Sequence, residues 1–298
     1  MSATPSVDRR PAAPAPGAAR TRLNPKNLAG HTAVVTGAGS GIGRSLATLL
    51  AERGAVVHAV DRDQAAAETV AAAIRDAGGH AEAHTVDVTD PAAVTRLADT
   101  LFADGPVDLL FNNAGIGVAA NIVDTTLDDW HRLIDVNLMG VVHGLNAFLG
   151  RMIDQDRPAH IMNTASMAGL VPNAGLGAYS ATKAAVVGLT EALDIELIGT
   201  KVRVSALCPG VIATGIVGAT TMRGVYETRR ARTADFYAAR GTSPDVVARQ
   251  ALAAVGRGRR IVPTPRYQTV PHWLLKRVLP PAGRRLSVAA YRFLRKED

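Results

Sequence analysis

The sequence predicts a doubly wound α/β fold, with a mostly seven-stranded parallel sheet and helices on both faces. From Thr32 onward, short runs of β-branched residues alternate with stretches rich in Ala and Leu. Such alternation is typical of parallel sheets built from strand–helix–strand units. Runs such as Ala33-Val34-Val35 are apolar at consecutive positions, as expected for strands covered by helices on both sides.

The elements are expected in strict alternation along the chain. They follow the β-branched runs and the Ala/Leu-rich stretches between them. Strands are expected over 32–36, 55–61, 81–86, 107–111, 160–163, 202–207 and 260–262. Helices are expected over 41–53, 63–77, 91–103, 126–153, 178–198 and 244–256.

A single folded domain is expected over residues 28–265, with a different kind of segment at each end. Residues 1–27 are rich in Pro, Ala and Arg and lack apolar periodicity, which predicts a disordered leader. Residues 214–242 interrupt the alternation with a long mixed segment, a candidate lid over a substrate site. Residues 266–298 form a basic, amphipathic C-terminal tail.

Charge and composition argue against several classes of protein. The net charge of +7 is concentrated at the ends, because residues 1–30 carry +4 and 257–298 carry +9, which leaves −6 for residues 31–256. An acidic body argues against nucleic-acid binding. The N-terminus lacks the apolar segment of a secretory signal, and no uncharged apolar run reaches the roughly 18 residues of a spanning helix. The single cysteine, Cys208, fits a reducing, cytoplasmic location.

A glycine-rich segment joins the first expected strand to the first helix. It reads Thr36-Gly37-Ala38-Gly39-Ser40-Gly41-Ile42-Gly43. Glycines allow the backbone to turn sharply and approach a pyrophosphate, and the helix N-terminus adds free N–H groups and a positive dipole end. Asp61 ends the second strand, where a carboxylate can accept hydrogen bonds from the adenosine ribose of a dinucleotide. These features predict a dinucleotide site of the Rossmann type.

Four motifs, in the expected order, resemble the short-chain dehydrogenase/reductase family. The glycine segment has the spacing Thr-Gly-x-x-x-Gly-x-Gly, and Asn112-Asn113-Ala114-Gly115 follows the fourth strand. Tyr179 and Lys183 form Tyr-x-x-x-Lys, with Ser166 thirteen residues upstream of the tyrosine. Pro209-Gly210-Val211-Ile212-Ala213-Thr214 follows the sixth strand. The resemblance covers residues 28–263 and implies an oxidoreductase that interconverts a secondary alcohol and a ketone.

The expected catalytic residues are Asn137, Ser166, Tyr179 and Lys183. Tyr179 and Lys183 are four apart on an expected helix, so both project from one face. A phenol with a pKa of ~10 is a poor base at neutral pH, so a nearby ammonium and an oxidised nicotinamide are expected to lower that pKa. Ser166 lies at the carboxyl edge of the sheet, where its hydroxyl can bond the substrate oxygen. The resemblance places Asn137 in a water-mediated proton relay to Lys183.

The resemblance also implies a set of cofactor contacts. Lys183 is expected to hold the nicotinamide ribose, Asp87 and Val88 to contact adenine, and Ile212 and Thr214 to meet the carboxamide. The full expected set is Gly37, Ser40, Gly41, Ile42, Gly43, Asp61, Arg62, Asp87, Val88, Asn113, Ala114, Gly115, Tyr179, Lys183, Pro209, Gly210, Ile212 and Thr214.

NAD is the expected cofactor, and NADP is the alternative. The Asp61 carboxylate would repel the 2′-phosphate of NADP, and Ser40 stands where NADP-preferring relatives commonly carry a basic residue. Arg62 favours NADP, because its guanidinium can bind that phosphate once Asp61 swings away.

The expected substrate contacts are Ser166, Met167 and Tyr179, in a mostly apolar pocket that predicts a lipophilic small molecule. The further pocket candidates are Ile116, Val118, Leu170, Val171, Pro172 and Ile216. Two alternatives stay open: an NADPH-dependent biosynthetic ketoreductase of the 3-oxoacyl type, and a non-enzymatic nucleotide-binding protein. No metal site is expected, because the eight histidines are scattered along the chain.

Two features predict contacts outside the chain. The helices expected near 126–153 and 178–198 join subunits in the resembled family, so a homotetramer or at least a homodimer is expected. Their apolar stripes are Leu133, Val136, Leu138 and Val141, and Val186, Leu189, Leu193 and Leu197. The tail over 270–296 interleaves apolar and basic residues, which leaves two interpretations open: a helix packed on the body, or a peripheral contact with the inner face of a membrane.

Overall fold

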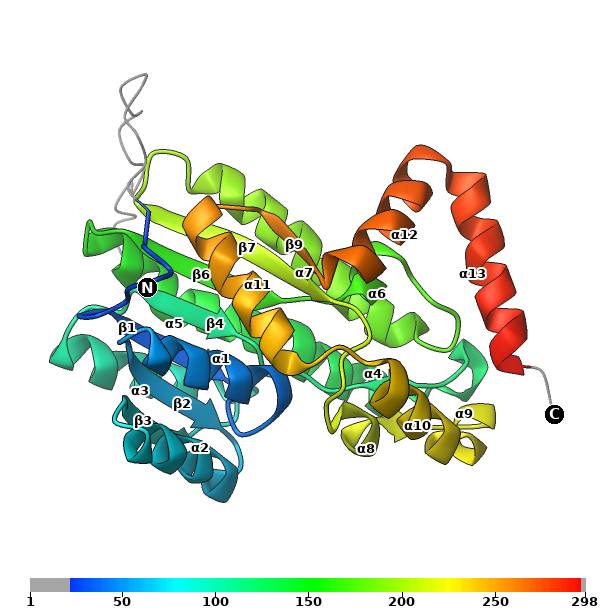
Figure 1. Cartoon of the computed structure of the whole chain (residues 1–298), viewed down its shortest axis with the longest axis horizontal. Coiled ribbons are helices and arrows are strands. Elements are labelled where there is room, and N and C mark those ends of the chain that lie inside the picture. The colour runs from blue at the N-terminus through cyan, green and yellow to red at the C-terminus, as the bar shows by residue number, and fades with distance from the viewer. Residues whose placement is uncertain (1–21, 296–298) are drawn as a thin grey trace, which may run out of the picture.

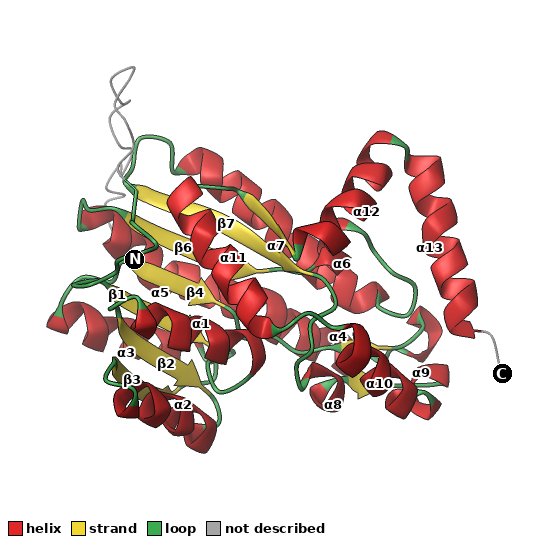
Figure 2. Ribbon diagram, in the orientation of Figure 1, coloured by secondary structure: helices red, strands yellow, loops and turns green. Residues whose placement is uncertain are grey.

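The computed structural model describes residues 22–295 and contains a seven-stranded sheet between two layers of helices (Figures 1 and 2). All seven strands are parallel, in the order β3-β2-β1-β4-β6-β7-β9. They are β1 (Thr32–Thr36), β2 (Val56–Asp61), β3 (His80–Thr85), β4 (Leu109–Asn112), β6 (Ala159–Thr164), β7 (Val202–Pro209) and β9 (Ile261–Thr264). The predicted Rossmann-type fold is therefore confirmed.

The helices form two layers because apolar residues alternate between the faces of each strand. Ala33 and Val35 of β1 belong to the cluster under α1 (Gly41–Glu52), α2 (Gln64–Asp76) and α11 (Pro244–Arg257). Val34 belongs to the cluster on the opposite face, under α3 (Pro91–Asp104), α5 (Gly140–Asp154) and α7 (Gly177–Glu196). Burial on both faces explains the consecutive apolar residues of this strand.

A π-helical turn interrupts the single helix that the sequence predicts over 126–153. Helix α4 (Leu127–Ile134) leads into the π turn η2 (Asp135–Met139), which continues as α5. Turns of this kind are rare and often mark functional sites. The stretch Leu127–Asp154 is long and apolar enough to cross a membrane, but here it packs on the sheet, as core helices with the same composition do.

Part of the predicted leader is ordered. Leu23 and Leu28 are both buried, and the Leu28 amide donates to the Arg53 carbonyl at 2.7 Å. The predicted boundary at residue 27 is therefore wrong, because isolated apolar anchors such as Leu23 produce no periodic pattern. The rest of that prediction, residues 1–21, lies outside the described residues.

The segment 214–242 folds into four short elements beside the carboxyl ends of the strands (Figure 1). They are α8 (Ile216–Ala219), β8 (Thr221–Met222), α9 (Val225–Thr228) and α10 (Arg230–Arg240). Strand β8 pairs with β5 (Val118–Ala119) in a separate two-stranded sheet. Arg223 anchors the segment to α4 through two hydrogen bonds to the buried carboxylate of Asp129, at 2.5 and 3.0 Å.

Loss of this ion pair is expected to loosen the segment and destabilise the fold. Arg223→Ala leaves the carboxylate of Asp129 buried without its cation, so we expect a fall of several degrees in Tm. Hydrogen bonds from Arg223 lower the pKa of Asp129 to about 2. The stabilisation is therefore full above the ordinary pKa of 3.8 and is lost as the pH falls through about 2. Thermal melts of wild type and variant measure both effects, and Asp129→Asn/Arg223→Ala, which removes the buried charge, should recover part of the loss.

The C-terminal tail forms a helical hairpin. Helix α12 (Arg266–Val278) packs on the body: Thr269 is fully buried, Trp273 contacts the core, and Lys276 Nζ donates to the Leu170 carbonyl at 2.8 Å. Helix α13 (Pro280–Arg295) then turns back and lies alongside α12 (Figure 1). Near its far end, the Tyr291 hydroxyl of α13 donates to Asn121 Oδ1 at 3.5 Å, so both helices of the hairpin contact the body.

Candidate active site

The four expected catalytic residues come from three elements that meet at the carboxyl edge of the sheet. Ser166 follows β6, Tyr179 and Lys183 lie on α7, and Asn137 lies in η2. Gly115 sits between two of them, because a Cβ there would lie 3.1 Å from Asn137 Oδ1 and 3.3 Å from Lys183 Nζ. A side chain at this position would therefore have to displace Asn137 or Lys183 by a few tenths of an ångström.

Lys183 is buried, and its side chain lies on the same face of α7 as Tyr179. Its Nζ donates to the Thr164 carbonyl at 2.8 Å and lies 5.9 Å from the centre of the Tyr179 ring. Burial lowers the pKa of Lys183 to about 8. The ammonium is therefore held at the end of β6, with part of its hydrogen-bonding capacity left for a ligand.

The pKa of Tyr179 differs from the expectation. Burial raises it to about 12, and a hydrogen bond with Ser166 opposes that rise. The predicted lowering by the Lys183 ammonium is therefore not found in the chain by itself, because desolvation of the phenolate is the largest effect on this pKa.

Ser166 has two roles in the structure. Its Oγ accepts from the Ala168 amide at 3.1 Å, which caps the short helix α6 (Met167–Leu170), and it can donate to the Pro209 carbonyl at 3.5 Å. The same hydroxyl forms a hydrogen bond with the phenol of Tyr179. The helix cap fixes the hydroxyl at the place where the sequence predicts a contact with the substrate oxygen.

Asn137 uses its side chain to hold the loop after β4. The amide of Ile116 donates to Asn137 Oδ1 at 2.9 Å, and Asn137 Nδ2 donates to the Ile116 carbonyl at 3.0 Å. Nδ2 also lies 3.4 Å from Thr182 Oγ1. Because the side-chain amide is engaged, the relay water expected at Asn137 would have to bind its main chain.

The glycine-rich loop has the shape that a pyrophosphate site requires. Gly37 and Gly41 have φ values of +65° and +51°, and a Cβ on Gly43 would lie 2.0 Å from the Gly37 carbonyl oxygen. Ser40 makes no side-chain cap to helix α1, so the first-turn N–H groups stay open to an anion. The loop, including Ile42 in the first turn, fits a dinucleotide cofactor.

The loop after β4 is tied to β1. The amides of Asn113 and Ala114 both donate to Thr36 Oγ1, at 2.9 and 3.1 Å, and Asn113 Nδ2 donates to the Thr36 carbonyl at 3.0 Å. Thr164 Oγ1 donates to Asn113 Oδ1 at 3.3 Å. The hydrogen bonds of the Asn113 side chain thus connect the carboxyl ends of β1, β4 and β6. The groups of residues 113–115 that remain for contact with a cofactor are those of the backbone.

The predicted adenosine residues lie at the ends of β2 and β3. Asp61 accepts from the amides of Gly39 at 2.9 Å and Asp63 at 3.1 Å, so its carboxylate faces the glycine loop, whereas Arg62 is exposed. Val88 is buried, with its carbonyl bonded to a ring nitrogen of His143 at 2.8 Å. Asp87 is exposed beside it.

The motif after β7 closes the site from the other side. A Cβ on Gly41 would lie 3.1 Å from Thr214 Cγ2, which brings the end of this motif against the glycine loop. Ile212 is buried, and the Gly210 amide donates to the Thr264 carbonyl at 2.7 Å, just after the buried Pro209. The structure therefore gathers all predicted cofactor segments along one edge.

The surroundings of Tyr179 are apolar. Ile116 and Val118 pack with Tyr179 and Trp130 in one cluster. Of the other pocket candidates, Met167 and Ile216 retain exposure, and Pro172 is exposed. Leu170 and Val171 instead join the core.

Sequence reasoning missed Tyr237 of α10. Its phenol is close enough to act on the pKa of Tyr179, and it packs with Leu176 and Tyr226. No motif surrounds Tyr237, so its position follows only from the folding of the segment 214–242.

Comparison with known proteins identifies the family. The model of the family "short chain dehydrogenase" matches residues 31–223, so the chain belongs to the short-chain dehydrogenase/reductase family. It is 38% identical over 247 residues to the probable oxidoreductase EphD of Mycobacterium tuberculosis, covering 80% of this chain and 42% of EphD. The chain thus spans about two-fifths of the length of that relative. It is 42% identical over 194 residues to 1-deoxy-11-beta-hydroxypentalenate dehydrogenase of Streptomyces avermitilis, covering 63% of this chain and 71% of the enzyme.

Solved structures of relatives carry nicotinamide cofactors. A short-chain dehydrogenase/reductase from Burkholderia phymatum in complex with NAD superposes with a TM-score of 0.79 at 34% identity, covering 84% of this chain and 94% of that one. A metagenomic short-chain oxidoreductase in complex with NADP has a TM-score of 0.64 at 33% identity, covering 80% and 96%. Together with the loop geometry, these complexes support a nicotinamide cofactor.

Proposed function

We propose that this chain is an oxidoreductase that interconverts a secondary alcohol and a ketone, with Tyr179 exchanging a proton with the substrate oxygen. The observation that carries the proposal is the convergence of Tyr179, Ser166 and Lys183 at the sheet edge beside an open glycine loop. A nicotinamide bound at the glycine loop would supply the hydride chemistry. The chain contributes orientation and proton transfer.

Each residue has a distinct part in this proposal. Ser166, fixed by its cap to α6, holds the substrate oxygen against Tyr179. Tyr179 gives its proton to a ketone oxygen, or accepts one from an alcohol. Lys183, fixed on the Thr164 carbonyl, steadies the charge of the phenolate and positions the cofactor ribose. The relay assigned to Asn137 would return the proton through water held by its main chain.

Turnover with both cofactors is the direct test. The protein is incubated with NAD⁺ or NADP⁺ and a panel of lipophilic secondary alcohols, and reduction of the cofactor is followed by absorbance. Turnover of at least one alcohol supports the enzyme. Tight binding of cofactor without turnover of any alcohol, or of any ketone with the reduced cofactor, would favour the non-enzymatic nucleotide-binding alternative.

The proposed substrate is lipophilic. The apolar cluster at Tyr179 and the neighbouring cluster with Leu176, Tyr226 and Tyr237 offer mostly aromatic and aliphatic surface to a ligand. The relative that acts on hydroxypentalenate supports a hydroxyl-bearing substrate of this kind. A 3-oxoacyl ketoreductase remains the second candidate, favoured by the exposed Arg62 beside Asp61.

We also propose that the chain forms a homo-oligomer, with an interface made by residues other than those of the predicted apolar stripes. Leu133, Val141, Val186, Leu193 and Leu197 are buried in the chain's own core, so that part of the prediction was wrong. The outward side of α7 instead carries the exposed Ala181, Ala185, Gly188 and Ile195. Light scattering should give at least twice the chain mass of 31.1 kDa, and Gly188→Trp should reduce it to the monomer. A wild-type mass of one chain would contradict the proposal.

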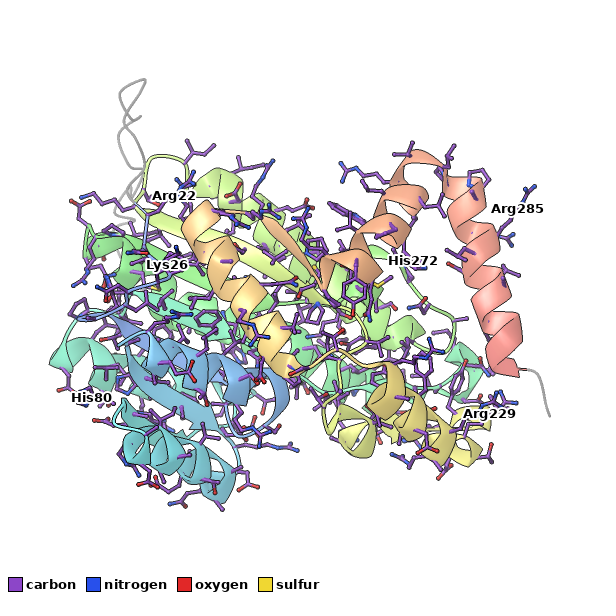
Figure 3. The ribbon with its side chains drawn as sticks, viewed as in Figure 1. Arg22, Lys26, His80, Arg229, His272 and Arg285 are labelled. Atoms are coloured by element: carbon purple, nitrogen blue, oxygen red, sulfur yellow. The ribbon has the colours of Figure 1, made fainter. Side chains whose placement is uncertain are left out.

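We propose that the hairpin turn between α12 and α13 contacts an anionic membrane surface. Arg277, Arg284 and Arg285 are exposed beside Val278 and Leu279, which are 71% and 57% exposed, at a turn that lies away from the sheet (Figures 1 and 3). No acidic residue occurs over 246–296. Each basic residue near such a surface contributes about 1 kcal/mol of binding free energy.

Reversing the charges at the hairpin turn distinguishes a specific membrane contact from the general attraction of a basic protein to anionic vesicles. The chain should float with phosphatidylserine vesicles, less so at high salt, and Arg284→Glu/Arg285→Glu should abolish flotation. The matched control is Arg22→Glu/Lys26→Glu, which changes the charge equally on the opposite side of the molecule (Figure 3). Absence of flotation, or equal loss in both variants, would leave the hairpin as a packing element only.

A further inference from the structure

Two histidines and a glutamate from neighbouring strands converge outside the active site. His58 lies in the middle of β2, and Glu82 and His84 lie in the edge strand β3. The parallel register pairs His58 with Glu82 and Val60 with His84. Because alternate residues of a strand share a face, all three side chains project from the same side of the sheet.

The three ligand atoms form a compact triangle. His58 Nδ1 lies 2.9 Å from His84 Nε2, and Glu82 Oε2 lies 3.7 Å from the first and 3.8 Å from the second. The point equidistant from the three atoms is about 2.0 Å from each, which is the bond length of Zn²⁺ to imidazole nitrogen and carboxylate oxygen. The atoms therefore need little movement to surround an ion.

Burial and charge prepare the two imidazoles as ligands. His58 is 8% exposed, and burial together with the neighbouring His84 lowers its pKa to about 4. Burial also lowers the pKa of His84, while Glu82 opposes that shift. Both rings are thus neutral at pH 7, as metal binding requires. Glu82 and, at the end of α3, Asp104 provide the negative charge that attracts a cation.

We propose that His58, Glu82 and His84 form a binding site for a divalent transition-metal ion of the Zn²⁺ class. Two imidazoles and one carboxylate suit such an ion and leave a fourth position for water on the side where Glu82 is exposed. Binding needs both facing nitrogens free, so the proton of the His58–His84 hydrogen bond moves to the other nitrogen of its ring. The ion would tie the edge strand β3 to β2, whatever reaction the enzyme performs.

The test uses the full chain without a polyhistidine tag, stripped of metal by dialysis against a chelator. Titration with Co²⁺ should give visible absorption bands that saturate at one ion per chain, and Zn²⁺ should displace the Co²⁺. Zn²⁺ should also raise Tm of the wild type. These readouts are independent of catalytic activity.

Three variants locate the ion. His84→Ala should weaken binding at least tenfold and remove the rise in Tm, and Glu82→Gln should weaken binding while keeping the fold. His84 is half-buried, so its replacement tests the site even if the buried His58 cannot be replaced without unfolding. The control is His80→Ala, on the same strand and exposed (Figure 3), which should bind as the wild type does. Absence of saturable binding, or undiminished binding by His84→Ala, would overturn the proposal.

Discussion

Tyr179→Phe is expected to lower kcat by at least ~10³-fold and leave the Kd for the cofactor within about twofold of the wild-type value. The phenylalanine ring fills the same space beside Ile116 and Trp130, so the fold has no reason to change. Only the hydroxyl that exchanges the proton is lost. Pre-steady-state turnover and fluorescence titration of the cofactor measure the two quantities. Retention of more than a tenth of wild-type kcat would remove Tyr179 from the role of acid and base.

Two further substitutions distinguish the parts played by the neighbours of Tyr179. Lys183→Ala should reduce both kcat and cofactor affinity, because the ammonium serves the phenolate and the ribose. Ser166→Ala should reduce kcat mainly, although loss of the cap to the Ala168 amide will cost some stability. Unchanged kinetics for either variant would show that the site has been assigned to the wrong residues.

Burial of Tyr179 makes a prediction about pH. Since burial raises the pKa of the phenol to about 12, the free chain has too little phenolate at neutral pH to act as a base toward an alcohol. Oxidation of the alcohol should therefore become faster as the pH rises from 6 to 8, the range in which Lys183, with a pKa of about 8, keeps its proton, while reduction of the ketone, which needs the protonated phenol, should not. Initial rates in both directions across this range measure the difference, and parallel profiles would contradict it.

Asp61→Ala is expected to shift the ratio of kcat/KM for NAD over NADP by about 10²–10⁴-fold toward NADP. Hydrogen bonds to a charged group are worth about 1.5–3 kcal/mol each, and the variant loses two to the ribose hydroxyls of NAD. It also removes the repulsion between the carboxylate and the 2′-phosphate, and leaves the exposed Arg62 free to bind that phosphate.

The control for Asp61→Ala is Asp63→Asn. Asp63 is a neighbouring carboxylate that caps α2 through the Ala66 amide, and asparagine preserves that cap. The ratio should stay near the wild-type value in this variant. A wild-type ratio that already favours NADP would mean that Arg62 outweighs Asp61, and the proposed preference for NAD would be wrong.

The sequence by itself determined the sheet and most of the edge at which the cofactor is proposed to bind. The strand–helix alternation and the glycine segment are encoded in contiguous residues, so each can be recognised without knowing what packs against it. Tyr179 and Lys183 were likewise predictable as a pair, because their four-residue spacing acts within one helix.

The tertiary structure decided what depends on residues distant in the chain. The π turn at Asn137, the ordered Leu23, the approach of Tyr237 to Tyr179 and the raised pKa of Tyr179 all arise from packing between separate elements. His58 and His84 are brought together by the pairing of β2 with β3, because the two histidines lie on different strands and share no local motif. Local patterns record the period of a strand or helix, whereas burial, and the pKa shifts that follow from it, are set only when the elements come together.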